Sequence, residues 1–165
     1  MNSWISTFLS RSVSPRSQSC FAGLLMGLAF PPLGQFYLVP VALIVLFRAL
    51  ADADAREQVY STAGFGFFFF LIHTYWFVNF HPLAFPGVLI VVSLLYGAWG
   101  YSLRWTGLSP WSLAGGWILL QSVLGAGPLA FPWSRLPTAL AVLPELVQPV
   151  HFVGELVYGG GIVLV

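Results

Sequence analysis

The chain has 165 residues, of which 58% are hydrophobic, 17% are aromatic and only 7% are charged, with a formal net charge of +1. A soluble globular domain carries about 25% charged residues to wet its surface, so this composition excludes that class and indicates an integral membrane protein. The small net charge gives no sign of nucleic-acid binding, and the single cysteine, Cys20, excludes an internal disulfide framework and a cysteine metal cluster.

The N-terminal region has the outline of a signal peptide. Residues 1–19 carry Arg11 and Arg16, and a short apolar run, 20–30, follows and ends at two prolines. There is no small-x-small cleavage site, which predicts an uncleaved first membrane segment behind a cytoplasmic segment of residues 1–19. A Pro-Gly turn then leads to a second run, 36–50, so the pair predicts a hairpin. Each run is shorter than the roughly 20 residues that cross a bilayer, which leaves open whether they span or are re-entrant.

Further apolar runs follow the polar connection 48–58. They are residues 59–80, 83–103, 111–124 and 150–165. The first two are long enough to span a bilayer, and a connection rich in proline and glycine separates the last two. This pattern predicts an all-α integral membrane protein, a bundle of five or six transmembrane helices, whose membrane domain covers residues 20–165. Small residues on several runs suit close helix approach: Gly23, Gly27, Gly97 and Gly100.

The basic residues predict an orientation. All six are arginines, and with the N-terminus in the cytoplasm and each run crossing in turn, only Arg135 falls outside. The other five lie inside: Arg11, Arg16, Arg48, Arg56 and Arg104. This is the bias of the positive-inside rule, so we expect a multi-pass protein with a cytoplasmic N-terminus.

The stretch GFGFFFFLIHTYWFVNFHP, residues 64–82, holds the first candidates for chemistry. His73 and His81 are eight residues apart, about two helical turns, so a metal pair is geometrically possible. No carboxylate or cysteine nearby offers a third ligand, and Pro82 puts His81 at a helix end. We therefore predict no metal site.

Simpler roles account for the remaining polar and aromatic candidates. We expect His73 to be hydrogen-bonded within the bundle, and the phenylalanine run to serve lipid contact and helix packing. Tyr75, Trp76 and His81 fall where an interfacial aromatic belt is expected. Two glutamates near the final run, Glu145 and Glu155, have no partner in the sequence that makes an acid-base pair, which favours a solvated or capping role. The residues by themselves predict no active site and no cofactor.

Four motifs in chain order resemble the apolipoprotein N-acyltransferases. LAFPPLGQFYLVPVALIVLFRAL resembles the turn between the family's first two membrane segments, and GFGFFFFLIHTYWFVNFH resembles its third segment, with Trp76, Asn79 and His81 in matching places. WILLQSVLGAGPLAFPWSRL is similar to the family's Trp-containing helix and Phe-Pro-Trp motif, and QPVHFVGELVYGGGIVLV to the helix after it. The resemblance implies outer-rim or lipid-facing candidates at Trp76, His81, Phe131, Pro132 and Trp133.

The chain departs from the family pattern at three positions. Gln121 stands where the family usually has Glu, Leu124 where it has Arg, and Ala130 where it has Gly. The first two changes remove an intramembrane ion pair that the resemblance implies. Gln121 and His73 remain as intramembrane polar residues.

The resemblance implies a function in lipoprotein maturation. In this family a Glu-Lys-Cys triad in a nitrilase-like domain takes an acyl group from a phospholipid and passes it to the N-terminal diacylglyceryl-cysteine of a lipoprotein. This chain has no lysine, and Cys20 is expected at the cytoplasmic end of the first run, so no catalytic residue is assigned. We expect the membrane portion of such an enzyme, in the bacterial cytoplasmic (inner) membrane, with its catalytic domain truncated or encoded separately.

Two other functions stay open. One is a non-catalytic, stand-alone membrane protein of the same ancestry that binds lipid or a partner, which the changes at Gln121 and Leu124 favour. The other is an unrelated small transporter subunit, for which the sequence shows neither a polar path nor an internal repeat. The expected partners are membrane phospholipid, a lipoprotein substrate and a separately encoded nitrilase-like domain, with no nucleic acid.

Overall fold

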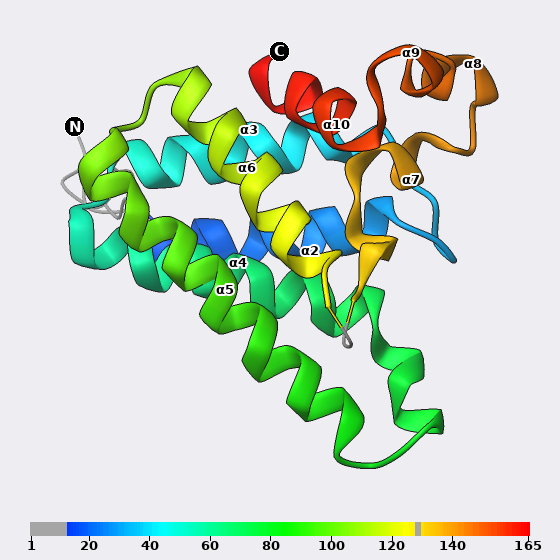
Figure 1. The fold of residues 1–165 in the computed structure, drawn as a ribbon. Helices are drawn as coiled ribbons and strands as arrows, with labels where there is room; N and C mark the ends of the chain where they lie inside the picture. Colours follow the sequence, from blue (N-terminus) through cyan, green and yellow to red (C-terminus); the bar gives the residue numbers. More distant parts are fainter. Residues whose placement is uncertain (1–12, 128–129) are drawn as a thin grey trace, which may run out of the picture.

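A computed structural model describes residues 13–127 and 130–165, and all regular structure in these ranges is helical (Figure 1). The prediction of an all-α chain is confirmed for this part of the protein. Arg11 and most of the predicted cytoplasmic segment lie outside the described residues.

The first two helices form the predicted hairpin. Helix α2 (Pro15–Ala29) begins before the apolar run, because the Ser14 hydroxyl caps it by accepting from the Ser17 backbone N–H at 3.3 Å, and Pro15 occupies its first turn. It ends before Pro31, and helix α3 (Leu38–Ala51) returns beside it.

Helix α4 (Ala55–His73) follows a short turn and is capped by Asp54, whose Oδ1 accepts from the backbone N–H groups of Arg56 and Glu57 at 2.9 and 2.8 Å. The predicted run 59–80 is not one helix. It breaks at Thr74, and a 3-10 helix, η1 (Tyr75–Asn79), continues it. At the break the Thr74 hydroxyl bonds the Phe70 carbonyl at 2.7 Å, which satisfies an acceptor of the last turn.

Helix α5 (Ala84–Thr106) is the one helix in the described ranges that is long and apolar enough to cross a membrane by itself. Helix α6 (Pro110–Leu124) is capped by Ser109. The prediction of a single final run, 150–165, is wrong, because Gly154 adopts φ +79° between two helices. The C-terminal elements are η2 (Pro132–Ser134), α7 (Leu136–Leu140), α8 (Pro144–Val147), α9 (Val150–Val153) and α10 (Glu155–Leu164).

Helix α4 lies at the centre of the arrangement, with α2 on one side and α5 on the other, while α10 packs against α6 (Figure 1). Glycines permit the close approach. A Cβ at Gly23 would lie 2.4 Å from the Phe65 carbonyl oxygen, and one at Gly100 would lie 2.6 Å from the Gln58 carbonyl oxygen. Gly27 is equally tight against α4, and Gly97 is in ordinary contact with it. The prediction of close helix approach at these positions is confirmed.

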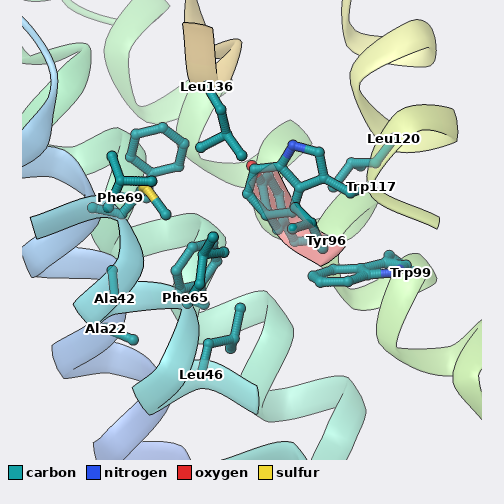
Figure 2. Close-up of a cluster of buried hydrophobic side chains, with 14 of the residues drawn as sticks. Ala22, Ala42, Leu46, Phe65, Phe69, Tyr96, Trp99, Trp117, Leu120 and Leu136 are labelled. Carbon is teal, nitrogen blue, oxygen red and sulfur yellow. The ribbon is translucent and has the colours of Figure 1, made fainter. Parts of the chain in front are cut away.

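An aromatic core joins the helices. Phe65 and Phe69 of α4 meet Tyr96 of α5 and Trp117 of α6 in one buried cluster (Figure 2). The phenylalanine run is divided between two environments, which agrees with the expectation that it serves both helix packing and outward contact. Phe69 and Phe70 are fully buried, whereas Phe67 and Phe68 of the same run are not. The helical period sends adjacent residues to different faces.

Candidate functional site

Four aromatic side chains from two distant segments meet beside the break after α4; we call them the aromatic rim: Trp76, Phe77, Phe131 and Trp133. The ring centroids of Trp76 and Trp133 are 5.1 Å apart, and those of Phe77 and Phe131 are 5.4 Å apart. The short helix η1 places the first two, and the Phe-Pro-Trp turn that enters η2 places the others. Trp76 is held further by its indole Nε1, which donates to the His73 carbonyl at 3.1 Å.

An apolar groove of about 490 Å³ opens next to the rim. Phe77 and Phe131 form its rim side, the first two turns of α5 form its wall, and Leu124 at the end of α6 closes it. Among the residues that the structure describes, no charged side chain lines this groove. A hydrocarbon chain therefore fits its chemistry, and its volume is in the range of ligand-binding clefts.

His73 lies behind the rim in an aromatic cage rather than in a polar network. Its ring stacks on Phe69 at 5.6 Å and meets Phe30, Phe70 and Phe131 edge-on at 4.9 to 6.1 Å. Neither imidazole nitrogen makes a hydrogen bond of standard geometry within the described part of the chain, although the Trp133 backbone lies near. The expected hydrogen bond of His73 within the bundle stays a prediction, with the Trp133 backbone as the nearby candidate partner, and the faces of the imidazole are covered by phenylalanines.

His81 lies apart from the rim. Its side chain is exposed, and its Nδ1 accepts from the Leu83 backbone N–H at 3.1 Å, so it caps the turn before α5. Because α4 ends at His73, the two histidines are not two turns apart on one helix. Of the five rim candidates from the sequence, Trp76, Phe131 and Trp133 come together, Pro132 lies between the last two in the chain, and His81 has no ring contact with them.

Gln121 connects α6 to η2. Its side chain is 2% exposed, and its Oε1 accepts from the Ser134 hydroxyl at 3.1 Å. The amide nitrogen Nε2 has no hydrogen-bond partner among residues 13–127 and 130–165. Gln121 therefore holds the segment that carries Phe131 and Trp133 against the end of α6.

An ion pair that the sequence did not predict also holds the segment that carries Phe131 and Trp133. The Arg135 guanidinium donates through Nη1 to Glu155 Oε2 at 2.5 Å, which joins the residue after η2 to the first turn of α10. The solvated or capping role expected for Glu155 is thus wrong. A signal was present in the sequence, because the only charged residues after Arg104 are Arg135, Glu145 and Glu155.

The remaining candidates offer no catalytic arrangement. In the described ranges no group of three or more His, Cys, Asp or Glu side chains could hold a metal ion. Cys20 is half-buried in α2, and a Cβ at Gly64 of α4 would lie 2.9 Å from its sulfur, so the thiol faces another helix. The candidate site therefore consists of an aromatic rim and an apolar groove.

Comparisons with known proteins identify the family of the chain. Residues 22–165 match the family model described as the apolipoprotein N-acyltransferase N-terminal domain. A curated apolipoprotein N-acyltransferase of Gloeobacter violaceus is 30% identical over 152 residues, which cover 79% of this chain and 29% of the relative. The chain thus spans less than a third of that relative's length, and similarity to this family suggests a membrane protein. On these matches, the chain belongs to the apolipoprotein N-acyltransferase N-terminal domain family.

Proposed function

We propose that this chain is the membrane portion of an apolipoprotein N-acyltransferase in the bacterial cytoplasmic (inner) membrane. It spans the membrane several times as a bundle of five or six helices and offers a lipid-facing platform at its rim. The acyl transfer from phospholipid to the N-terminal diacylglyceryl-cysteine of a lipoprotein belongs to a nitrilase-like domain with a Glu-Lys-Cys triad. The 165 residues contain no lysine, so this triad is not among them.

The observation that carries the proposal is the aromatic rim beside the apolar groove. Segments more than 50 residues apart in the sequence, at Trp76 and at Trp133, fold so that their rings meet where the groove opens. Tryptophan is the residue that membrane proteins place at the boundary between headgroups and hydrocarbon. A phospholipid acyl chain in the groove would place its headgroup beside these rings, facing an outer catalytic domain.

The distribution of arginines supports the orientation with a cytoplasmic N-terminus. Arg16 at the start of α2, Arg56 at the start of α4 and Arg104 at the end of α5 gather at the end of the bundle opposite the rim (Figure 1). Arg48 belongs to the same end, in the last turn of α3, and Arg135 lies near the rim. An ion pair between Arg16 and Glu57, with both contacts at 2.6 Å, ties the starts of α2 and α4 together. These four arginines thus lie at the end that we assign to the cytoplasm, as the positive-inside rule predicts.

The helix lengths bear on how the bundle crosses the membrane. Helix α5 alone reaches across about 30 Å of hydrocarbon, at 1.5 Å per residue. The shorter helices α2, α3 and α6 would cross with the help of the turns that flank them, and α4 with η1. In this proposal the membrane domain is residues 20–165, and residues 1–19 lie on the cytoplasmic side.

The proposal is tested by deleting the gene and measuring the lipoprotein N-terminus by mass spectrometry. We expect lipoproteins that carry the diacylglyceryl group but lack the third acyl chain. Restoring the gene with Trp111→Ala should recover the third chain, because this exposed tryptophan begins α6 at the arginine end. Restoring it with Trp133→Ala, which removes a rim ring, should recover much less. Fully triacylated lipoproteins in the deletion strain would contradict the proposal.

A second candidate is a non-catalytic protein of the same ancestry that binds lipid or a partner. It is favoured by Gln121 and Leu124, where neutral side chains occupy positions at which the family carries charges. In that case the deletion would leave triacylation unchanged while the purified chain still bound phospholipid. Co-purification of a separately encoded nitrilase-like domain with the tagged chain would instead support the first candidate.

A further inference from the structure

A second pocket lies at the arginine end, remote from the rim. It measures about 370 Å³ and opens between the first turns of α4 and the last turns of α5, which pack side by side (Figure 1). Two arginines and two tyrosines dominate its lining, and small apolar residues complete it: Arg56, Arg104, Tyr60, Tyr101, Ala55 and Val59. Each helix contributes one arginine and one tyrosine.

Both arginines face this pocket without a bound carboxylate. In the part of the chain that the structure describes, neither Arg56 nor Arg104 forms an ion pair or a side-chain hydrogen bond. The carboxylates beside Arg56 have other partners, since Asp54 caps α4 through two backbone N–H groups and Glu57 is paired with Arg16. Two positive charges therefore converge on one concavity with nothing negative in it.

Aromatic rings lie beside both guanidinium groups, and the Tyr60 ring also carries the Arg16 guanidinium at 4.4 Å. The Arg104 guanidinium carbon lies 4.7 Å from the Tyr101 ring centroid and 5.2 Å from that of Trp105, and that of Arg56 lies 5.7 Å from Tyr60. Such cation–π contacts leave the N–H edges of a guanidinium free to donate. The paired donor edges match the oxygens of a phosphate group, which arginine binds in a bidentate manner.

The surroundings of the pocket indicate a lipid as the source of that phosphate. Trp105 and Trp111 at the same end are 68% and 77% exposed, as in the aromatic belts that mark headgroup depth. The inner side of the pocket is apolar at Ala55 and Val59. Basic pockets between membrane helices on the cytoplasmic side are suited to anionic lipid headgroups.

We propose that Arg56 and Arg104 form a binding site for the phosphate of an anionic phospholipid headgroup at the arginine end. In the orientation proposed above this is the cytoplasmic leaflet, opposite the groove for the acyl donor. The site is distinct from that groove, and lipid binding here needs no acyltransferase activity. A lipid bound between the two helix ends would fasten α4 to α5 at the membrane surface.

Lipid binding can be measured on the 165-residue chain in a neutral detergent by native mass spectrometry, with titrated dioleoylphosphatidylglycerol. We expect Arg56→Gln and Arg104→Gln each to weaken the first binding event about fivefold, and the double variant about 25-fold. The matched control is Arg48→Gln, which removes the same charge from an exposed position at the same end but outside the pocket. It should change the affinity less than about twofold.

Two comparisons distinguish the source of the phosphate. Dioleoylphosphatidylcholine should bind more weakly than the anionic lipid, and excess sodium phosphate should not displace the bound lipid. An equal loss in Arg48→Gln would mean diffuse charge attraction and would overturn the site. Equal binding of the two lipids, or displacement by sodium phosphate, would overturn the assignment to an anionic headgroup. All three arginines are exposed, and far-UV circular dichroism confirms that each variant is folded before it is titrated.

Discussion

The contact between α2 and α4 depends on Gly23, and the substitution Gly23→Ala tests it. The added Cβ would lie 2.4 Å from the Phe65 carbonyl oxygen and 3.1 Å from both Phe68 Cβ and the Phe69 backbone nitrogen. Two of these three neighbours are backbone atoms of α4, which cannot turn aside as the end of a side chain can. The helices must therefore separate by more than half an ångström to restore a normal contact.

The expected cost follows from two opposing effects. Overpacking a well-packed interior costs about 1–3 kcal/mol, and the backbone neighbours place this case at the upper end. Replacing a helical glycine by alanine returns up to about 1 kcal/mol through helix propensity. We therefore expect Gly23→Ala to lower the free energy of unfolding by about 2 kcal/mol.

Gly115→Ala is the matched control, because Gly115 also lies inside a helix but has nothing within 4 Å of its added Cβ. This variant should be as stable as the parent or more stable by up to about 1 kcal/mol. Unfolding is followed by far-UV circular dichroism as sodium dodecyl sulfate is titrated into detergent micelles of each variant. If Gly23→Ala and Gly115→Ala unfold at the same detergent fraction, the reasoning about the α2–α4 contact is refuted.

Three further experiments probe the rim and its supports. Arg135→Gln should lower the free energy of unfolding by about 1–2 kcal/mol, because its ion pair with Glu155 is partly shielded from solvent. A double-mutant cycle with Glu155→Gln should give a coupling energy of about 1 kcal/mol. Additive losses would mean that the pair contributes nothing. His73→Phe should preserve the free energy of unfolding or raise it by about 1 kcal/mol. The substitution removes a buried imidazole that, among the described residues, makes no hydrogen bond of standard geometry. A marked loss of stability would show that His73 has a polar role. In a double-mutant cycle measured by thermal unfolding, Trp76→Ala and Trp133→Ala should show a coupling energy of about 0.5–1.5 kcal/mol. Independent effects would contradict the contact of the two rings at 5.1 Å.

The order of the helices could be predicted from local patterns. The apolar runs locate α3, α5 and α6 to within three residues at each end. Helix α2 begins at Pro15, before its run at residue 20, because Ser14 and Pro15 start it. The breaks were harder to foresee. The end of α4 at His73 depends on how Thr74 and Trp76 bond the last carbonyls, and the hydrophobic pattern runs on through that point.

The candidate site could be predicted in part. The Trp76 and Phe-Pro-Trp motifs were singled out by resemblance, and the structure brings their rings together. His81 was included with them and lies apart, since it caps its own turn. The ion pair of Arg135 with Glu155 joins residues 20 apart across the three short helices α7, α8 and α9, and no helical period relates them.

The sequence by itself was enough to predict the helical class of the protein. With 7% charged residues the chain cannot wet a globular surface, and the same composition and caps dictate helices because a helix satisfies its own backbone groups. Only the tertiary structure decided which helix faces are buried and which residues of separate segments meet. It buried Phe69 and left Phe67 outside, placed Trp133 beside Trp76, and brought Arg56 and Arg104 to one pocket. These are contacts between segments far apart in the chain, and they depend on how helices pack rather than on local sequence.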